Sequence, residues 1–503
     1  MNVSQSKTPT IQTMTWINRF AALGPEFSAE VLPSPLPEPA WVARNFDLAK
    51  CLALPENWLE SPEGLSVFSG NGLWEGMQSR ASVYSGHQFG QWAGQLGDGR
   101  ALSLGEFQTT KGPIEIQLKG AGKTPFSRMG DGRAVLRSSI REYLCSEAMA
   151  GLGIPTTRAL CLSTSPQRVL REEIETAAVV TRTAPSFIRF GHFEHFANQP
   201  QGMGHLKQLA DFTLENFVQP KQEFSANPYA NLLHEVTHST ALLMAQWQSV
   251  GFCHGVMNTD NMSIMGLTLD YGPFQFMDGF NPSHICNHTD QMGRYAYGRQ
   301  PQVAYWNLFC LAQALMPLIE EQDLAMEALE TYKSTFQNHW AQKFLAKMGL
   351  EVSEHPEQRD SDTLLLNELL EKLAAEQVDF TIFWRNLTDA VIASSASSAE
   401  WRRLSDLFID QTAWHEWQTK YLIRLEKLDP HQSHRIMRSA NPKYILRNHL
   451  AESAIQKSKM GDHSEVDTLF KLLQTPFDDQ MEFDHYANLP PDWASSIEIS
   501  CSS

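Results

Sequence analysis

The sequence contains few cysteines, and no two of them form a metal-binding pair. Seven cysteines lie at positions 51, 145, 161, 253, 286, 310 and 501, and none has the CxxC spacing of a zinc ribbon. Disulfides are rare in the cytoplasm, so this pattern indicates mostly reduced thiols in a cytoplasmic protein.

Positive charge is also scarce. The 503 residues include 57 acidic and 40 basic side chains, which give a formal net charge of −17. This balance argues against nucleic acid or an acidic membrane surface as the main partner. An anionic ligand would therefore need a local basic site.

Long apolar segments are absent as well. A membrane helix needs about 20 consecutive apolar residues, and we find no run that approaches this length. The N-terminus lacks the basic patch and apolar core of a secretory signal. Lys7 and Arg19 are the only basic residues before Glu26, which argues against a transit peptide. We expect a cytoplasmic protein without a membrane partner.

The most informative stretch runs from His254 to Gly272 and contains no lysine or arginine. Asn261 and Asp270 offer the hard oxygen donors that suit Mg²⁺, which binds through one or two carboxylates plus substrate phosphates. Asp260 remains as a carboxylate that could accept a proton. Kinases use the same trio in the same order, but the His-Arg-Asp form of their catalytic loop is missing here. A bare Asn-Thr-Asp-Asn would favour an ordinary turn; the Asp-Tyr-Gly that follows argues for a metal and phosphate site.

A glycine-rich segment, residues 84–100, precedes two expected strands at 101–104 and 114–119. Such a loop lets backbone N–H groups approach phosphates, and Arg100 adds positive charge. The alternative is a pair of tight hairpin turns without a ligand. Gly120 to Thr124 resembles the tail of a P-loop, but Gln117 stands where the motif needs glycine, so we interpret it as a decoy.

A lysine and a glutamate follow the pattern of a kinase ion pair. Lys119 ends an alternating strand, and Glu142 lies in a helix expected over residues 134–149. Arg133, Arg137 and Arg141 share one face of this helix, for which a solvated surface is the simpler interpretation.

Other charged residues cluster near expected element ends. Asp131 and Gly132 lie at the helix entrance, where anions are favoured. Arg182 and Arg189 flank a proline turn after a strand, and their planar donor groups suit phosphate oxygens. His192 and His195 lack a third ligand at metal spacing, so we interpret them as ordinary polar histidines.

The order of these patterns predicts an α+β fold in four parts. A proline-rich run, residues 32–39, indicates an extended surface arm over residues 1–40. Residues 41–190 are expected to form a mixed α/β N-lobe with the glycine-rich nucleotide loop. Residues 191–400 are expected to form a mainly helical C-lobe with the catalytic and metal-binding loops, including a strong helix over 231–250. Residues 401–503 are expected to form a helical extension.

Several motifs together resemble those of the selenoprotein O family, and the resemblance covers most of the chain from about residue 40 to 503. They are Gly-Asp-Gly-Arg (97–100), Gln-Leu-Lys-Gly (117–120), Asp-Gly-Arg (131–133), Arg-Glu-Tyr-Leu (141–144), His-Gly-Val-Met-Asn-Thr-Asp-Asn (254–261) and Asp-Tyr-Gly-Pro (270–273). The resemblance implies a protein-kinase-like two-lobed fold that binds ATP in a flipped orientation. Members transfer AMP to Ser, Thr or Tyr hydroxyls of proteins, and some use UTP with Mn²⁺.

The resemblance also implies a role for each matching residue. The residues implied to bind the nucleotide are Gly97, Gly99, Arg100, Lys119, Asp131, Gly132, Arg182, Arg189 and Asp270. Glu142 would hold Lys119. Asp260 would be the proton acceptor, and Asn261 and Asp270 would bind Mg²⁺, with Mn²⁺ as the alternative.

The chain ends in Cys-Ser-Ser, and Cys501 takes the place of the selenocysteine of vertebrate family members. An exposed tail cysteine could pair with another thiol, and Cys286, in the turn-rich stretch after the active site, is the candidate partner. This pair would provide redox control. The alternative is a free terminal thiol without a role.

The resulting hypothesis is a monomeric protein adenylyltransferase that uses ATP and acts on protein hydroxyls. Two alternatives remain: a kinase-type phosphotransferase and a non-catalytic pseudokinase scaffold that binds nucleotide. The missing His-Arg-Asp form and the many arginines argue against a standard kinase. The intact Lys119, Glu142, Asn261 and Asp270 argue against a scaffold, which has no need for metal ligands.

Overall fold

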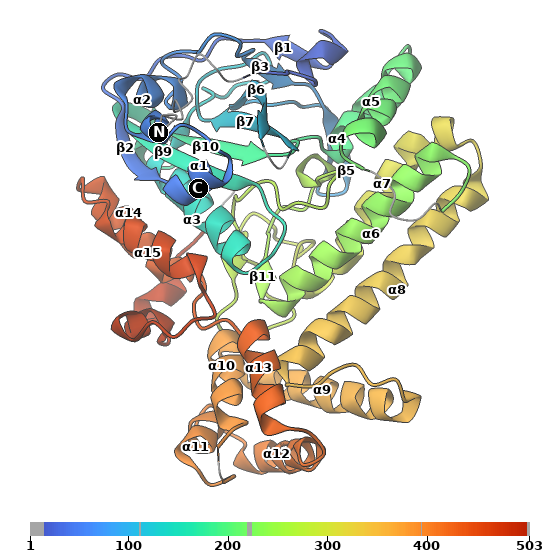
Figure 1. Cartoon of the computed structure of the whole chain (residues 1–503), viewed down its shortest axis with the longest axis vertical. Coiled ribbons are helices and arrows are strands. Elements are labelled where there is room, and N and C mark those ends of the chain that lie inside the picture. The colour runs from blue at the N-terminus through green and yellow to red at the C-terminus, as the bar shows by residue number, and fades with distance from the viewer. Residues whose placement is uncertain (1–14, 110–111, 219–223, 394, 500–503) are drawn as a thin grey trace, which may run out of the picture.

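The computed structural model describes residues 15–109, 112–218, 224–393 and 395–499, and the following account concerns these residues (Figure 1). An antiparallel sheet occupies the N-terminal part of the chain, and helices form most of the remainder. The predicted mixed α/β N-terminal part and helical C-terminal part are therefore confirmed.

The main sheet has the strand order β1-β3-β6-β7-β10-β9-β2, with β8 paired to β10, and each recorded pairing is antiparallel. The strands are β1 (Ser28–Glu30), β2 (Ala40–Arg44), β3 (Arg80–Ser82), β6 (Ala101–Thr109), β7 (Gly112–Lys119), β8 (Ala134–Val135), β9 (Arg158–Leu170) and β10 (Ile174–Ala184).

The register of β7 and β10 gathers the polar side chains on one face of the sheet. Side chains alternate between faces along a strand, so Ile116 and Leu118 enter the apolar core while Gln117 and Lys119 point the other way. Arg182 of β10 lies directly opposite Gln117. Three polar side chains thus share the face that turns towards the helical part.

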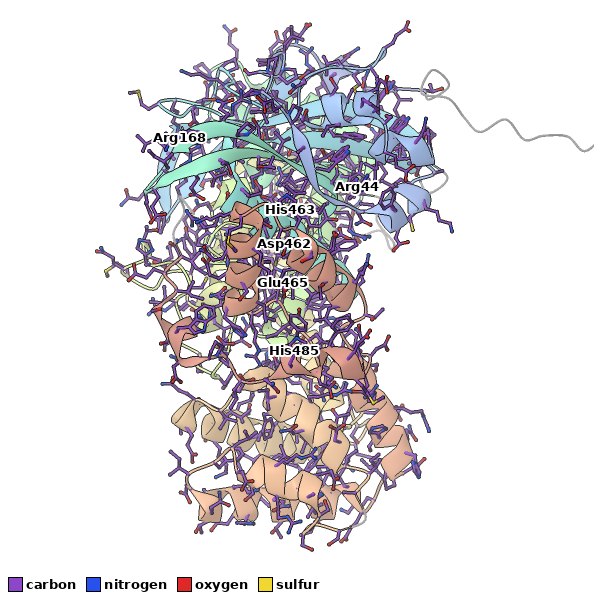
Figure 2. All side chains as sticks on the ribbon, turned by 90° about the vertical axis from the view of Figure 1, so that its left-hand side faces the viewer. Arg44, Arg168, Asp462, His463, Glu465 and His485 are labelled. Atoms are coloured by element: carbon purple, nitrogen blue, oxygen red, sulfur yellow. The ribbon has the colours of Figure 1, made fainter. Side chains whose placement is uncertain are left out.

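Helix α3 (Leu136–Gly151) lies between that sheet and two helices from the far end of the chain (Figure 1). These are α14 (Asn448–Lys459) and α15 (Ser464–Gln474). Tyr143 of α3 stacks on Phe470 of α15, with ring centroids 5.4 Å apart. Figure 2 shows Asp462, His463 and Glu465 of this segment below Arg44 and Arg168 of the sheet.

The other helices are short α1 (Phe46–Cys51) and α2 (Pro62–Phe68), then α4 (Phe190–Ala197), α5 (Met203–Asn216), α6 (Pro228–Ser249), α7 (Gln300–Ile319), α8 (Gln322–Lys347), α9 (Pro356–Glu376), α10 (Phe380–Ala390), α11 (Ala399–Ser405), α12 (Gln411–Leu425) and α13 (Pro430–Ala440). The helix predicted over 231–250 corresponds to α6. The Asn227 side chain accepts from Tyr229 N and Ala230 N, Pro228 fits the first turn, and Gly251 follows with a φ of 68°.

Two sequence expectations differ from the structure. The segment before residue 40 is more than a surface arm: β1 joins the sheet, and Phe27 and Leu36 are buried. The glycine-rich segment contains its own hairpin, β4 (Ser85–Gln88) and β5 (Gln91–Gln95).

The interpretation of Gly120 to Thr124 as a P-loop decoy is confirmed, because a turn and then β8 follow rather than a helix.

Contrary to the expectation from the sequence, one segment among the described residues, Tyr297–Ile319, is long and apolar enough to cross a membrane by length and composition. It includes α7, and 56% of its apolar window is buried within the protein. Core helices of soluble proteins pass the same test, so this segment is weak evidence for a membrane span.

Candidate functional site

The stretch from His254 to Gly272 is held as a closed loop by a short two-stranded sheet. β11 (Phe252–Cys253) pairs antiparallel with β12 (Gln275–Phe276). The Phe252 ring packs against both Phe274 and Phe276 in the core. Within the loop, residues Thr259–Asn261 form a short 3-10 turn, η4.

Asp270 is the centre of a buried charge cluster. Its Oδ1 lies 3.0 Å from Lys119 Nζ and 2.5 Å from Arg182 Nη1, and its Oδ2 lies 2.5 Å from Arg189 Nη1. Burial alone would raise the pKa of Asp270. The charges of Arg189, Lys119 and Arg182 outweigh burial and hold this pKa well below its usual range.

Glu142 joins the sheet to this cluster. Its Oε2 lies 2.6 Å from Lys119 Nζ, and its Oε1 lies 2.9 Å from Arg182 Nη1. Gln117 also accepts a hydrogen bond from Arg182. Three cations therefore face two carboxylates, which leaves one positive charge for an anionic ligand.

A cleft of about 380 Å³ opens above the cluster. It is lined by Tyr84, Asp98, Gly99, Arg100, Ala101, Lys119, Ser127, Arg182, Arg189, His254, Val256, Asn261, Asp270, Gly272 and Pro273. The predicted site residues Gly99, Arg100, Lys119, Arg182, Arg189, Asn261 and Asp270 thus share one cleft, although they are spread over more than a third of the chain.

Three predicted nucleotide-binding residues lie outside this lining. A Cβ at Gly97 would lie 2.5 Å from Phe126 Cγ, so the Phe126 ring packs closely on the Gly97 backbone. Asp131 is exposed and pairs with Arg171 at 2.8 Å. Gly132 has a φ of 70° and packs against the Gly122 backbone. Their nucleotide roles stay predictions.

Asp260 sits beside the cleft with one carboxylate oxygen available. Its Oδ2 accepts from Gln88 Nε2 at 3.2 Å, while its Oδ1 is buried and has no hydrogen-bond partner among the described residues. Burial raises the pKa of Asp260 to about 6, although Arg189 lowers it. A general base works best with a pKa near the operating pH, so this carboxylate suits proton acceptance.

The residues present fit a hard divalent metal. Asn261 and Asp270 both line the cleft and offer oxygen donors. Asn261 Nδ2 donates to Val256 O at 3.0 Å, which leaves the amide oxygen as the group available to a metal.

Sequence reasoning missed the contacts between the β4–β5 hairpin and the loop from His254 to Gly272. His87 N donates to Thr259 Oγ1 at 2.7 Å, and Phe89 N donates to Asn258 Oδ1 at 3.1 Å. The glycines permitted a hairpin, but no local signal showed that it would cover Asp260.

Arg133, Arg137 and Arg141, at the start of α3 and along it, bind other parts of the protein and do not form a solvated face. Arg133 donates to Ser34 O and Pro35 O, and Arg137 pairs with Glu175 at 2.8 Å. Arg141 donates to Phe274 O at 2.6 Å and lies over that ring. The interpretation as a solvated face was wrong, because long-range partners bury most of this row.

His192 and His195 do not form a metal pair. His192 Nδ1 accepts a hydrogen bond from Arg189 N at 3.0 Å, and His195 Nδ1 lies 2.9 Å from Ser85 Oγ. Both side chains are buried, and burial lowers the pKa of each, so they remain neutral. Their interpretation as ordinary polar histidines agrees with these contacts.

Comparison with known proteins identifies the family. Residues 10–474 match the family model described as protein adenylyltransferase SelO. A protein nucleotidyltransferase YdiU from Albidiferax ferrireducens is 55% identical over 493 residues, which cover 97% of each chain. Proteins of the same name from Variovorax paradoxus and Dechloromonas aromatica are 53% and 50% identical, again over 97% of each chain. The chain therefore belongs to the SelO family of protein adenylyltransferases.

Proposed function

We propose that this enzyme transfers AMP from ATP to Ser, Thr or Tyr hydroxyls of proteins and releases pyrophosphate, with UMP from UTP as a second activity. The observation that carries the proposal is the convergence of Lys119, Arg182 and Arg189 on Asp270 in a cleft beside Asp260. A local excess of positive charge suits a triphosphate in a chain whose net charge is −17.

The proposal includes a protein-kinase-like arrangement. Residues 41–190 form the N-lobe, to whose sheet the preceding segment adds β1, residues 191–400 form the C-lobe, and residues 401–503 are a helical extension. The Lys119–Glu142 pair between a strand and the following helix supports this division, as does a catalytic loop between two short paired strands.

Six residues in or beside the cleft have a chemical role in the proposed reaction. The acceptor hydroxyl oxygen forms a bond to the α-phosphorus, its proton passes to Asp260, and the bond from the α-phosphorus to the bridging oxygen breaks. Lys119, Arg182 and Arg189 stabilise the charge that develops on the departing pyrophosphate. Asn261 and Asp270 would hold Mg²⁺ or Mn²⁺, which neutralises phosphate charge when bound.

The partners in this proposal are ATP and acceptor proteins, with no nucleic acid and no membrane, for a monomer in the cytoplasm. The acidic net charge supports the absence of nucleic acid. Tandem mass spectrometry of acceptor proteins incubated with enzyme, ATP and Mg²⁺ tests the reaction. AMP on Ser, Thr or Tyr is the expected modification, and phosphate alone would contradict the proposal.

We also propose that Cys286 forms a regulatory disulfide with Cys501, which lies outside the described residues. The described part of the tail supports this pairing, because Ile499 is buried and its carbonyl oxygen accepts from His288 N, two residues after Cys286, at 3.2 Å. Cys286 Sγ also contacts the start of the catalytic loop, where a Cβ at Gly255 would lie 2.7 Å away. Non-reducing peptide mapping that finds Cys501 free under mild oxidation would contradict this pairing.

A further inference from the structure

A second group of chemically reactive side chains lies outside the nucleotide cleft. His87 of β4, Glu194 of α4 and Cys310 of α7 each offer a ligand atom, and these atoms all lie within 4.8 Å of one another. His87 Nδ1 is 2.5 Å from Glu194 Oε1. Residues more than 200 positions apart thus meet at one point between the hairpin and two helices.

The composition of this group differs from that of the cleft. An imidazole, a carboxylate and a thiolate form a donor set that suits Zn²⁺, whereas the proposed Mg²⁺ ligands of the cleft, Asn261 and Asp270, are oxygen donors. Three protein ligands leave one tetrahedral position for water or another ligand.

One carboxylate oxygen of Glu194 is an independent observation that points to a ligand. Oε1 pairs with His87, but the carboxylate is only 2% exposed and Oε2 accepts no hydrogen bond of normal geometry from the described residues, although the Thr259 hydroxyl lies nearby. A buried carboxylate is costly unless it is paired or bound to a metal.

The group is accessible from solvent. A groove of about 440 Å³ reaches it, and its lining includes His87, Trp306, Phe309 and Cys310. An ion and a water molecule could therefore enter without unfolding of α7.

We propose that His87, Glu194 and Cys310 bind one Zn²⁺ ion that fastens the β4–β5 hairpin to α4 and α7. On binding, the thiol proton of Cys310 and the proton between His87 and Glu194 are released to solvent. The resulting site joins three elements by metal–ligand bonds.

Such an ion would act on the catalytic loop through neighbouring residues. His87 N already donates to Thr259 Oγ1, and Gln88 Nε2 donates to Asp260 Oδ2. A Cβ at Gly86 would lie 2.8 Å from Thr259 Oγ1, so the hairpin packs tightly on this loop. The ion is therefore a positioning device for Gln88 and Asp260 rather than a participant in the transfer.

The metal binding itself does not depend on the proposed transferase activity, so it can be tested alone. The full chain, stripped with a chelator and kept in excess Mg²⁺ to fill the proposed Mg²⁺ site of the cleft, would be titrated with Co²⁺ and Zn²⁺. We expect one tight Zn²⁺ per chain and, with Co²⁺, a thiolate-to-metal charge-transfer band.

Cys310→Ser should abolish the charge-transfer band and weaken Zn²⁺ binding at least about tenfold. Cys51→Ser is the matched control, because Cys51 is exposed on α1. This substitution should leave the charge-transfer band and the Zn²⁺ affinity unchanged. A measurement on the unaltered chain guards against misfolding of the variant: Zn²⁺ should protect Cys310 from alkylation, as mapped by mass spectrometry. No charge-transfer band, or a band that persists in Cys310→Ser, would overturn the proposal and leave an ordinary His87–Glu194 ion pair.

Discussion

Lys119 forms an ion pair with Glu142, with 2.6 Å between Nζ and Oε2, and both side chains are largely buried. The same carboxylate binds Arg182 through its other oxygen. Glu142 therefore sets the position of two of the three cations around Asp270. A single residue of α3 thus controls the charge distribution in the cleft.

Replacing Glu142 by glutamine should weaken ATP binding by about tenfold or more, because Lys119 and Arg182 lose the partner that orients them. Isothermal titration with ATP and Mg²⁺ measures this. Glu175→Gln is the control, since Glu175 pairs with Arg137 away from the cleft. Equal losses of ATP affinity in the two variants would show a general effect on folding instead.

Substitutions of Asp270 and Asp260 should have different effects on nucleotide binding and on the transfer rate. Asp270→Ala removes the proposed metal ligand and the partner of three cations, so metal-dependent nucleotide binding should disappear. Asp260→Ala should retain binding and lower the transfer rate about 10²- to 10⁴-fold, the usual contribution of a general base. Equilibrium binding with and without Mg²⁺, together with turnover, distinguishes the two. Unchanged turnover in both variants would contradict the assigned roles.

Glu115→Gln should alter how stability depends on pH. Burial, aided by the charge of Glu106, raises the pKa of Glu115 from 4.5 to about 8. Between these values the folded chain keeps a proton that the unfolded chain has lost, so this residue makes stability fall as pH rises. Glutamine does not titrate.

The free energy of unfolding of Glu115→Gln, relative to the unaltered chain, should therefore increase between about pH 5 and pH 8, by up to about 1.4 kcal/mol per pH unit. Urea unfolding at several pH values measures this difference. A difference that stays constant over the range would show that Glu115 is ionised in the folded chain.

Arg447→Met should destabilise the chain by about 3–5 kcal/mol, because it leaves two carboxylates without their buried partner. Arg447 donates to Asp379 at 2.9 and 3.0 Å and also to Asp278. Lys420→Met is the matched control: its pair with Glu368 is exposed and should contribute less than about 1 kcal/mol. Urea unfolding measures the free energy of unfolding of both variants. A loss of less than about 1 kcal/mol in each variant would contradict the role of Arg447.

Local patterns were enough to predict the parts of the site that depend on strand alternation and helix position. The alternating residues before Lys119 place it on the same face as Gln117, and the helix that follows the strand carries Glu142 back to it. The oxygen donors Asn261 and Asp270 share a loop, so their common location was also predictable.

Contacts between distant segments were not predictable from local patterns. Arg141 binds Asn448, 307 residues away, which turns an apparently solvated arginine into a buried one. Gln88 reaches Asp260 only because the β4–β5 hairpin folds onto the catalytic loop. The position of Asp131 depends on Arg171, whose pairing is set by the β9–β10 connection.

One experiment tests nucleotide transfer directly. Purified chain and generic acceptor proteins would be incubated with Mg²⁺ and ATP labelled, in separate reactions, at the α or the γ phosphate. Label should enter protein from α-labelled ATP only, and Asp260→Ala should reduce this incorporation. Incorporation from the γ label alone would show phosphate transfer and contradict adenylyl transfer, and no incorporation from either label despite measurable ATP binding would show a scaffold that binds nucleotide without transferring it.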